Sequence, residues 1–171
     1  MEPLQTERLL LRPPTLRDVP TLFEFLGDPL AMQHTHLDGS LRQCRRRIAV
    51  HERRRRRDGT APWTVLARQG GGIVGWGGIY EDPFDPGWGV ELGYAFHPRV
   101  WGRGYATEFA GFSVDYADRV LALPELNAFA KADNAASRRV LEKAGFEELG
   151  FEPALGRLRY RRVRARGWAR S

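Results

Sequence analysis

The sequence predicts a single mixed α/β domain that spans residues 1–171. A chain of 171 residues is long enough for one domain with a substantial core. Segments with helical periodicity alternate with short β-rich segments, and no linker or repeat separates them. The β-rich segments gather before and around a glycine-spaced turn at 101–106, which favours strands of one sheet.

The first half of the chain contains two predicted helices and three predicted strands. Apolar residues within 16–26 recur at spacings of three and four, which predicts a helix that ends at Gly27-Asp28-Pro29. A second helix is predicted over 41–57, where the apolar positions are few. Strands are predicted for the β-rich runs at 8–12, 62–68 and 73–80. Glycines between the last two runs predict a hairpin turn.

The second half continues with strands on both sides of a long helix. Residues 89–96 alternate between apolar and other side chains and predict a strand, and a helix over about 104–121 follows the glycine turn. A shorter helix is predicted over 135–144 because Gly145 is a typical C-terminal residue. The remaining strands are predicted at 126–131, 146–151 and 156–164.

The composition bounds the compartment and the class of site. No apolar run is long enough to cross a bilayer, and the first residues do not resemble a secretory signal. Cys44 is the single cysteine, which excludes an internal disulfide and a cysteine-based zinc cluster. We therefore expect a cytoplasmic protein with no membrane partner and no metal.

The chain is basic, with a formal net charge of +6, and this raises nucleic acid as a partner class. Among the 27 basic residues, however, only Lys131 and Lys143 are lysines, which points to a coding bias rather than to a selected binding surface. The run Arg53–Arg57, with Arg42 and Arg45–Arg47 on the same helix, is the strongest charge feature. For it, and for the tail Arg157–Arg170, a solvated surface is favoured over contact with an acidic acceptor, ribosomal RNA or the phosphates of a cofactor.

The most informative stretch is Glu91–Glu108, in which a strand runs into a glycine-spaced turn and then into a helix. Glycines allow the backbone to approach a ligand closely, and the first amides of a helix have no internal partner. These amides and the positive end of the helix dipole attract anions. The stretch therefore predicts a site for a phosphate-bearing ligand.

Three stretches together resemble the GNAT superfamily of acyl-CoA-dependent N-acyltransferases. Thr6–Arg12 with the following helix is similar to the opening of the branch that contains the bacterial ribosomal-protein N-terminal acetyltransferases. Glu91–Glu108 is similar to the acetyl-CoA motif of the superfamily, with Trp101 in place of the usual Gln or Arg. Asn134-x-x-Ser137 followed by Val140–Phe146 is similar to the second signature of the branch.

The resemblance implies a fold and a co-substrate. The expected fold is a mostly antiparallel twisted sheet of six to seven strands, splayed between the fourth and fifth, with about four flanking helices. The expected co-substrate is acetyl-CoA, with its pantetheine arm placed in the splay like an added strand. Backbone groups of Phe96 and His97 are expected to pair with this arm. The pyrophosphate is expected on the amides of Gly102, Arg103, Gly104, Tyr105, Ala106 and Thr107.

Two residues of the second signature have alternative roles. By resemblance Asn134 contacts the cofactor near the pantetheine, and it equally suits the N-cap of the helix over 135–144. Ser137 can face the thioester sulfur and protonate the leaving thiolate, or it can be a solvated helix serine. Many members of the superfamily carry a tyrosine acid four residues further on, but this chain has Leu141 there. Ser137, a water or another tyrosine must then serve, unless no acid is needed.

On the acceptor side, Glu91 is the candidate general base. It lies on the strand that leads to the turn, and its alternative is an ion-paired strand glutamate. His34 and His36, in the loop between the first two helices, can contact the acceptor or relay a proton, and ordinary loop residues are their favoured alternative.

We therefore interpret the chain as an acetyl-CoA-dependent N-acetyltransferase in which an amine attacks the thioester directly. The favoured acceptor is a protein N-terminal α-amine, and nucleic acid is met only incidentally through the ribosome. Two alternatives stay open: a small-molecule acetyltransferase for an amino acid, polyamine or antibiotic, and a non-catalytic acyl-CoA or RNA-binding module. The sequence also leaves open whether the chain forms a homodimer.

Overall fold

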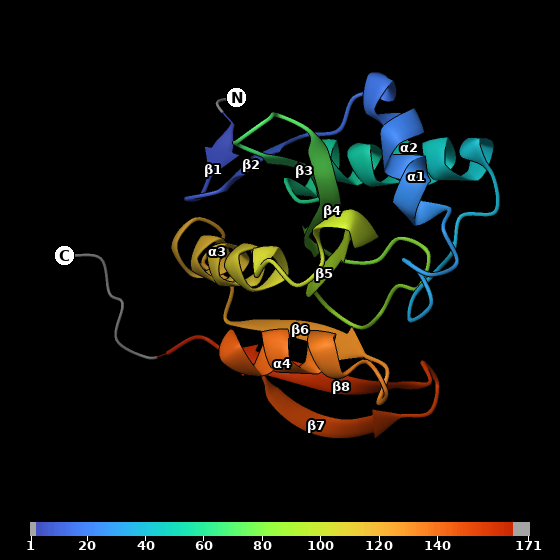
Figure 1. Ribbon diagram of the computed structural model, residues 1–171. Coiled ribbons are helices and arrows are strands. Elements are labelled where there is room, and N and C mark those ends of the chain that lie inside the picture. Colours follow the sequence, from blue (N-terminus) through green and yellow to red (C-terminus); the bar gives the residue numbers. More distant parts are fainter. Residues whose placement is uncertain (1–2, 166–171) are drawn as a thin grey trace.

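The computed structural model describes residues 3–165, and the two ends of the predicted domain lie outside this range. Within these residues, eight strands form one sheet in the order β1-β2-β3-β4-β5-β6-β8-β7 (Figure 1). The strands are β1 (Leu4–Gln5), β2 (Leu9–Arg12), β3 (Trp63–Ala67), β4 (Ile73–Tyr80), β5 (Glu91–Phe96), β6 (Glu125–Ala130), β7 (Glu147–Glu152) and β8 (Arg157–Val163).

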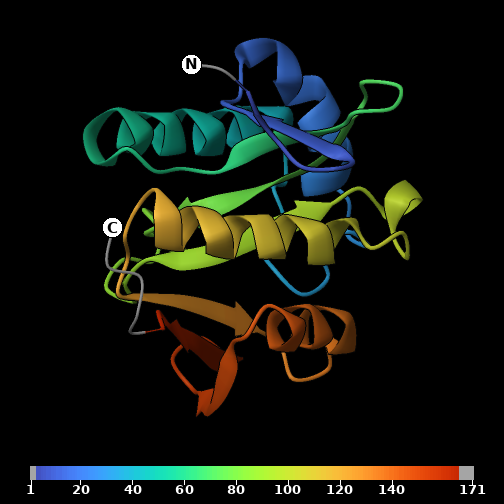
Figure 2. The ribbon, with the colours of Figure 1, turned by 90° about the vertical axis from the view of Figure 1, so that its left-hand side faces the viewer.

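Four α-helices flank the sheet in the described part of the chain. They are α1 (Val19–Leu26), α2 (Leu41–Asp58), α3 (Tyr105–Arg119) and α4 (Ala135–Lys143), and the short 3₁₀ helices Leu16–Asp18 and Pro98–Val100 precede α1 and the glycine turn. Helices α1 and α2 lie together on one side of the central strands, and α3 lies on the other (Figures 1 and 2). The mixed α/β prediction with about four helices is confirmed.

The sheet is splayed between β5 and β6. Most neighbouring strands pair antiparallel over several residues, whereas β5 and β6 run parallel and share the single register pair Glu91↔Asn127. The Asn127 amide donates to the Val90 carbonyl at 3.0 Å, and no further register pair follows toward Phe96. This opening is the predicted splay. The fourth and fifth predicted strands are β5 and β6 of the structure, because β1 was not predicted.

The predicted six to seven strands become eight because of β1. This strand has two residues, and Leu4 and Gln5 pair with Leu11 and Leu10 of β2. Two residues carry no alternation that a sequence pattern can reveal, so only the pairing with β2 defines the strand.

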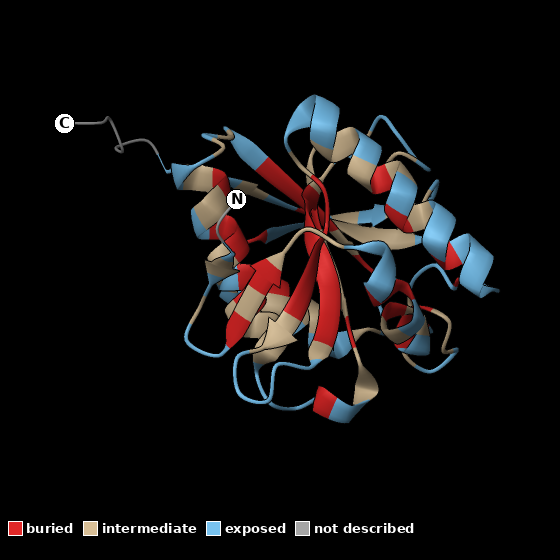
Figure 3. Ribbon diagram, turned by 90° about the horizontal axis from the view of Figure 1, so that it is seen from above, coloured by how far each residue is buried: buried red, intermediate tan, exposed pale blue. Residues whose placement is uncertain are grey.

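Each layer of helices buries its own apolar cluster against the sheet. On one side α3 buries Phe109, Ala110 and Val114 against the central strands. On the other side α2 buries Cys44, Ile48 and His51, and the first two pack with α1 and Trp76. Figure 3 shows the buried residues concentrated in the central strands, between the two helical layers.

Side-chain alternation along β5 links these two layers to the site. Successive residues of a strand point to opposite faces of the sheet. Leu92 and Phe96 belong to the cluster under α3, whereas Ala95 packs against the cluster of α1 and α2. Tyr94 therefore points to the side of α3 and α4, and Glu91 and Gly93 point to the side of α2.

Candidate active site

A cavity of about 690 Å³ follows the splay from the start of α3 to the loop between α1 and α2. This volume is in the range of small-molecule and cofactor sites. The walls come from the α1–α2 loop, β4, β5, the glycine turn, β6 and the first turns of α4. Because β5 and β6 separate here, the cavity connects the two faces of the sheet.

The glycine turn forms one end of the cavity. Gly102 and Gly104 have φ values of +75° and +78°, in the left-handed region that favours glycine. The Glu108 amide donates to the Gly104 carbonyl at 3.1 Å as the first helical bond, which leaves the preceding amides of α3 without a helical partner. The predicted cofactor residues that line the cavity here are Gly102, Gly104, Tyr105, Ala106 and Thr107. Arg103 is not among the lining residues.

Residues of the turn between β1 and β2 brace this glycine turn, and the sequence did not reveal this contact. The Glu108 carboxylate accepts hydrogen bonds from the Thr6 hydroxyl at 2.5 Å, the Arg8 amide at 2.8 Å and Arg8 Nε at 2.6 Å. Arg8 also donates to the Arg103 carbonyl at 2.7 Å. Burial acts to raise the pKa of Glu108, but the hydrogen bonds from Thr6 and Arg8 prevail and lower it. The carboxylate therefore stays charged and holds the turn against the sheet.

Phe96 and His97 are placed differently with respect to the splay. The His97 amide donates to the Val74 carbonyl of β4 at 2.8 Å and therefore faces away from the splay. His97 is not among the residues that line the cavity. Backbone groups alternate in direction along an antiparallel pair, so those of Phe96 and Tyr94 face the splay. The Phe96 carbonyl accepts a hydrogen bond from the Trp101 indole at 2.9 Å, which gives the unusual Trp101 a structural role.

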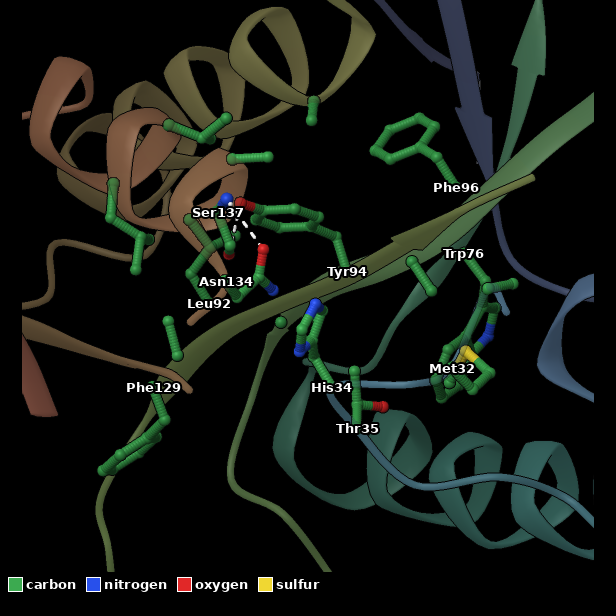
Figure 4. Close-up of a pocket in the computed structure, with 18 of the residues that line it drawn as sticks. Met32, His34, Thr35, Trp76, Leu92, Tyr94, Phe96, Phe129, Asn134 and Ser137 are labelled. Carbon is green, nitrogen blue, oxygen red and sulfur yellow. Dashed lines mark hydrogen bonds between the residues drawn. The ribbon is translucent and has the colours of Figure 1, made fainter. Parts of the chain in front are cut away.

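Two hydroxyl groups meet in the middle of the cavity. The Tyr94 hydroxyl lies 3.1 Å from Ser137 Oγ, and Figure 4 shows the phenol of β5 reaching the first turn of α4. Burial raises the pKa of Tyr94 to about 12, although the hydrogen bond with Ser137 acts to lower it. Leu141, where many relatives were expected to carry tyrosine, is buried in the wall. Tyr94 was absent from the sequence-based site, because alternation predicts its strand and its face but not its contact with Ser137.

Asn134 caps α4 in the structure. Its side-chain oxygen accepts a hydrogen bond from the Ser137 amide at 3.2 Å. Asn134 also lines the cavity beside Ser137 (Figure 4). The capping alternative is thus present, and the cap fixes the direction of the Ser137 side chain.

Glu91 lines the cavity on the face opposite to Tyr94. Burial raises the pKa of Glu91 to about 8, and the nearby Asp82 carboxylate adds to this shift. A carboxyl group with such a pKa exchanges its proton near neutral pH, as a general base must. Tyr80 of β4 pairs with Glu91 and lines the same end, and it was not predicted. Arg47 and Arg157 also line this end, although the sequence favoured a solvated surface for both.

His34 and His36 both line the cavity from the α1–α2 loop. His34 Nδ1 lies 3.5 Å from Asp133 Oδ1, across the splay, and points toward β5 in Figure 4. His36 Nε2 lies 3.5 Å from the buried Asp38 carboxylate, and burial lowers the pKa of His36. The loop therefore closes one side of the cavity with two imidazoles.

The arginine run on α2 is largely used in local contacts. Arg55 bonds to Glu52 and to the carbonyls of Ala61 and Pro62, while Arg54 and Arg57 pair with Asp58. Within residues 3–165 no group of three or more His, Cys, Asp or Glu side chains is arranged to hold a metal ion. No helix in this range is long and apolar enough to cross a membrane.

Comparisons with known proteins agree on the family. The model of the acetyltransferase (GNAT) domain family matches residues 8–147. The uncharacterized protein YkkB of Bacillus subtilis is 33% identical over 143 residues, which are 83% of each chain. The crystal structure of an acetyltransferase from Agrobacterium tumefaciens superposes with a TM-score of 0.81 at 27% identity, over 96% of this chain and 95% of that one.

The fold is shared with a ribosomal-protein acetyltransferase. RimL, a ribosomal L7/L12 alpha-N-protein acetyltransferase solved in complex with coenzyme A, superposes with a TM-score of 0.75 at 19% identity. The similarity covers 95% of this chain and 98% of that one. At this identity the likeness concerns the fold.

Proposed function

This chain belongs to the GNAT acetyltransferase family, and we propose that its cavity binds acetyl-CoA and that the protein acetylates an α-amine. One observation carries the proposal: a single cavity joins the free amides of α3, the hydroxyls of Tyr94 and Ser137, and the carboxyl group of Glu91. These are the kinds of group that a phosphate-bearing thioester and an attacking amine require.

The residues at the turn fit the proposed co-substrate. The cavity is lined by the first residues of α3, whose amides have no helical partner and suit a pyrophosphate. The backbone groups of Phe96 and Tyr94 that face the splay suit the amides of a pantetheine arm. Acetyl-CoA, when bound, supplies an acetyl group activated as a thioester.

Three groups of the chain then perform the transfer. Glu91 accepts the proton that the attacking amine loses, directly or through a water. A strand amide near Phe96 polarises the acetyl carbonyl. The Tyr94–Ser137 pair donates a proton to the departing thiolate. Because the reactants are held side by side, much of the rate enhancement comes from positioning.

The α-amine is favoured over other amines by the match of pKa values. An α-amine has a pKa of about 7.7–8.0 and a lysine amine about 10.4. Burial raises the pKa of Glu91 to about 8, which matches the pKa of an α-amine. Proton transfer to Glu91 therefore costs little free energy from an α-ammonium group and much more from a lysine ammonium group. A protein N-terminus is the α-amine that we favour, and a free amino acid offers the same group.

The test is acetyl transfer from acetyl-CoA to N-terminal peptides, amino acids and polyamines, followed by mass spectrometry, with the wild type and the Glu91→Gln variant. We expect kcat/KM on α-amines to rise as the pH passes through about 8, because Glu91 acts in its deprotonated form. Glu91→Gln should lower kcat/KM by roughly 10²–10⁴-fold, the range of general base catalysis.

The exposed neighbour Glu81 provides the control, since Glu81→Gln removes a carboxylate that does not line the cavity. Unchanged kcat/KM in Glu91→Gln would remove Glu91 as the base. Acetyl-CoA binding without transfer to any amine would favour a non-catalytic acyl-CoA-binding module instead.

A further inference from the structure

Four charged side chains surround the acceptor end of the cavity: Arg47, Asp82, Glu91 and Arg157, here called the charged quartet. They come from four separate parts of the chain, namely α2, the β4–β5 loop, β5 and the start of β8. The proposed transfer uses Glu91 and assigns no role to the two guanidinium groups. Two cations beside the attacking amine need an explanation, because an ammonium group would be repelled by them.

The quartet converges on the hydroxyl of Tyr80. This hydroxyl lies directly over Gly93, where an added Cβ would stand 2.2 Å from it. Burial raises the pKa of Tyr80, Glu91 and Asp82 raise it further, and Arg47 and Arg157 act to lower it. All four charged side chains therefore act electrostatically on the Tyr80 hydroxyl in the cavity wall. The hydroxyl fits there because residue 93 is a glycine and has no side chain.

Arg47 is fixed in place at this point. Its Nε donates to the buried Asp38 carboxylate at 3.0 Å, and its guanidinium lies 5.0 Å from the centre of the Phe84 ring. Its side chain is 15% exposed. A guanidinium held in this way keeps a defined direction toward the cavity and loses little entropy when it binds a ligand.

Arg157 differs from Arg47 because it has no carboxylate partner. Within residues 3–165 Arg157 forms no ion pair, although the residue is partly buried and lines the cavity. Its charge is felt by Glu91, whose pKa it acts to lower, but burial prevails and keeps that carboxyl a weak partner. Taking an arginine partly out of water is costly unless an anion compensates it, and guanidinium groups bind carboxylates with paired hydrogen bonds. A ligand carboxylate at this end would provide the partner that the chain does not.

We infer that the acceptor carries a carboxylate a few bonds from its amine, and that Arg157, assisted by Arg47, binds this carboxylate while Glu91 receives the amine proton. The inference rests on the proposed acetyl transfer and specifies its substrate class. It disfavours polyamines, which carry no anion for Arg157 to bind. The carboxylate has two sources, a free amino acid or an acidic side chain at the start of a peptide.

The experiment compares acceptors that differ only in the anion. The probes are the common L-amino acids, their carboxamides and their decarboxylated amines, together with tripeptide amides that have aspartate or alanine at the first and second positions. Each is assayed for acetyl transfer with the wild type and with Arg157→Gln, Arg157→Lys and Arg161→Gln. Arg161 lies on the same face of β8, is exposed and does not line the cavity, so it is the matched control.

We expect the wild type to prefer the carboxylate member of a matched set by at least about tenfold in kcat/KM, which corresponds to about 1.4 kcal/mol. Arg157→Gln should remove this preference mainly through KM, Arg157→Lys should restore part of it, and Arg161→Gln should leave it unchanged. Preference among free amino acids would identify a small-molecule acceptor, and preference confined to aspartate tripeptides would identify a peptide.

The inference and the proposed function fail in different ways. Equal transfer to carboxylate and amide members, transfer confined to amines without an anion, or an undiminished preference in Arg157→Gln would overturn the inference and leave acetyl transfer intact. Acetyl-CoA binding without transfer to any probe would overturn both, and no acetyl-CoA binding at all would overturn the proposed function at its cofactor site.

Discussion

Tyr94 places a hydroxyl group at the point where the cofactor and acceptor parts of the cavity meet. The sequence pattern predicts its strand and its face correctly, because Leu92, Tyr94 and Phe96 alternate along β5. The contact with Ser137, 43 residues further along the chain, depends on how α4 packs and has no local signal. Leu141 indicates only that no tyrosine acts from that position, and we propose Tyr94 as the acid.

Tyr94→Phe tests this acid. With its pKa raised by burial to about 12, the phenol stays protonated over the whole working pH range and can donate a proton throughout it. We expect kcat to fall by about tenfold to a hundredfold with KM nearly unchanged, less than for many general acids because a thiol with a pKa near 8.5 leaves easily. Thiol release under saturating substrates measures the effect.

A second tyrosine serves as the control for this substitution. Tyr116 packs against Trp63 and does not line the cavity, so Tyr116→Phe should leave kcat unchanged. Wild-type kcat in Tyr94→Phe together with a reduced kcat in Ser137→Ala would assign the proton to Ser137 or to a water that it holds.

At the scale of elements, the glycine turn was predictable and its support was not. The order of strand, turn and helix in Glu91–Glu108 indicates an anion site because each part has a local signal. The brace joins Arg8 to Glu108, which are 100 residues apart, and neither segment has a local sequence pattern that predicts the contact. Trp101 likewise departs from the expected motif, and only its bond to the Phe96 carbonyl explains it.

Glu108→Gln tests the brace. The pKa of Glu108 is lowered in the folded protein, so its stabilising effect is present above the unfolded pKa and is lost as the pH falls through the folded one. At pH 7 we expect a loss of about 1–2 kcal/mol, since charge-assisted hydrogen bonds weaken, and each 1 kcal/mol lowers Tm by about 2–4 °C. Thermal unfolding at pH 7 and pH 3 measures the difference.

The exposed Glu142 of α4 gives the matched substitution, and Glu142→Gln should change Tm little at either pH. The gap between Glu108→Gln and the wild type should close in acid. A Tm equal to that of the wild type at pH 7 would show that the brace does not stabilise the fold.

At the scale of the whole molecule, the splay divides the work between two faces of one sheet. Figure 4 shows Tyr94 of β5 beside Ser137 of α4, on the side where α3 lies. Glu91 and the other members of the charged quartet line the part of the cavity on the side of α2. Periodicity predicted the helices and nearly all the strands, because each has its own pattern of apolar residues. At the end of the cavity proposed for the acceptor, the sequence named only Glu91, His34 and His36 as site residues. Arg47, Tyr80 and Arg157 come together there through long-range packing, which has no local sequence pattern.

Calorimetric titration of the wild type, Gly104→Glu and Gly156→Glu with acetyl-CoA tests whether the turn at the start of α3 binds the phosphates of this co-substrate. Both glycines have positive φ, +78° and +63°, so both variants carry similar backbone strain, but only Gly104 lines the cavity. We predict saturable binding by the wild type and Gly156→Glu, and none by Gly104→Glu, which adds a negative charge at the turn that would repel the phosphates. Absence of binding by the wild type, or full binding by a folded Gly104→Glu, would contradict the account.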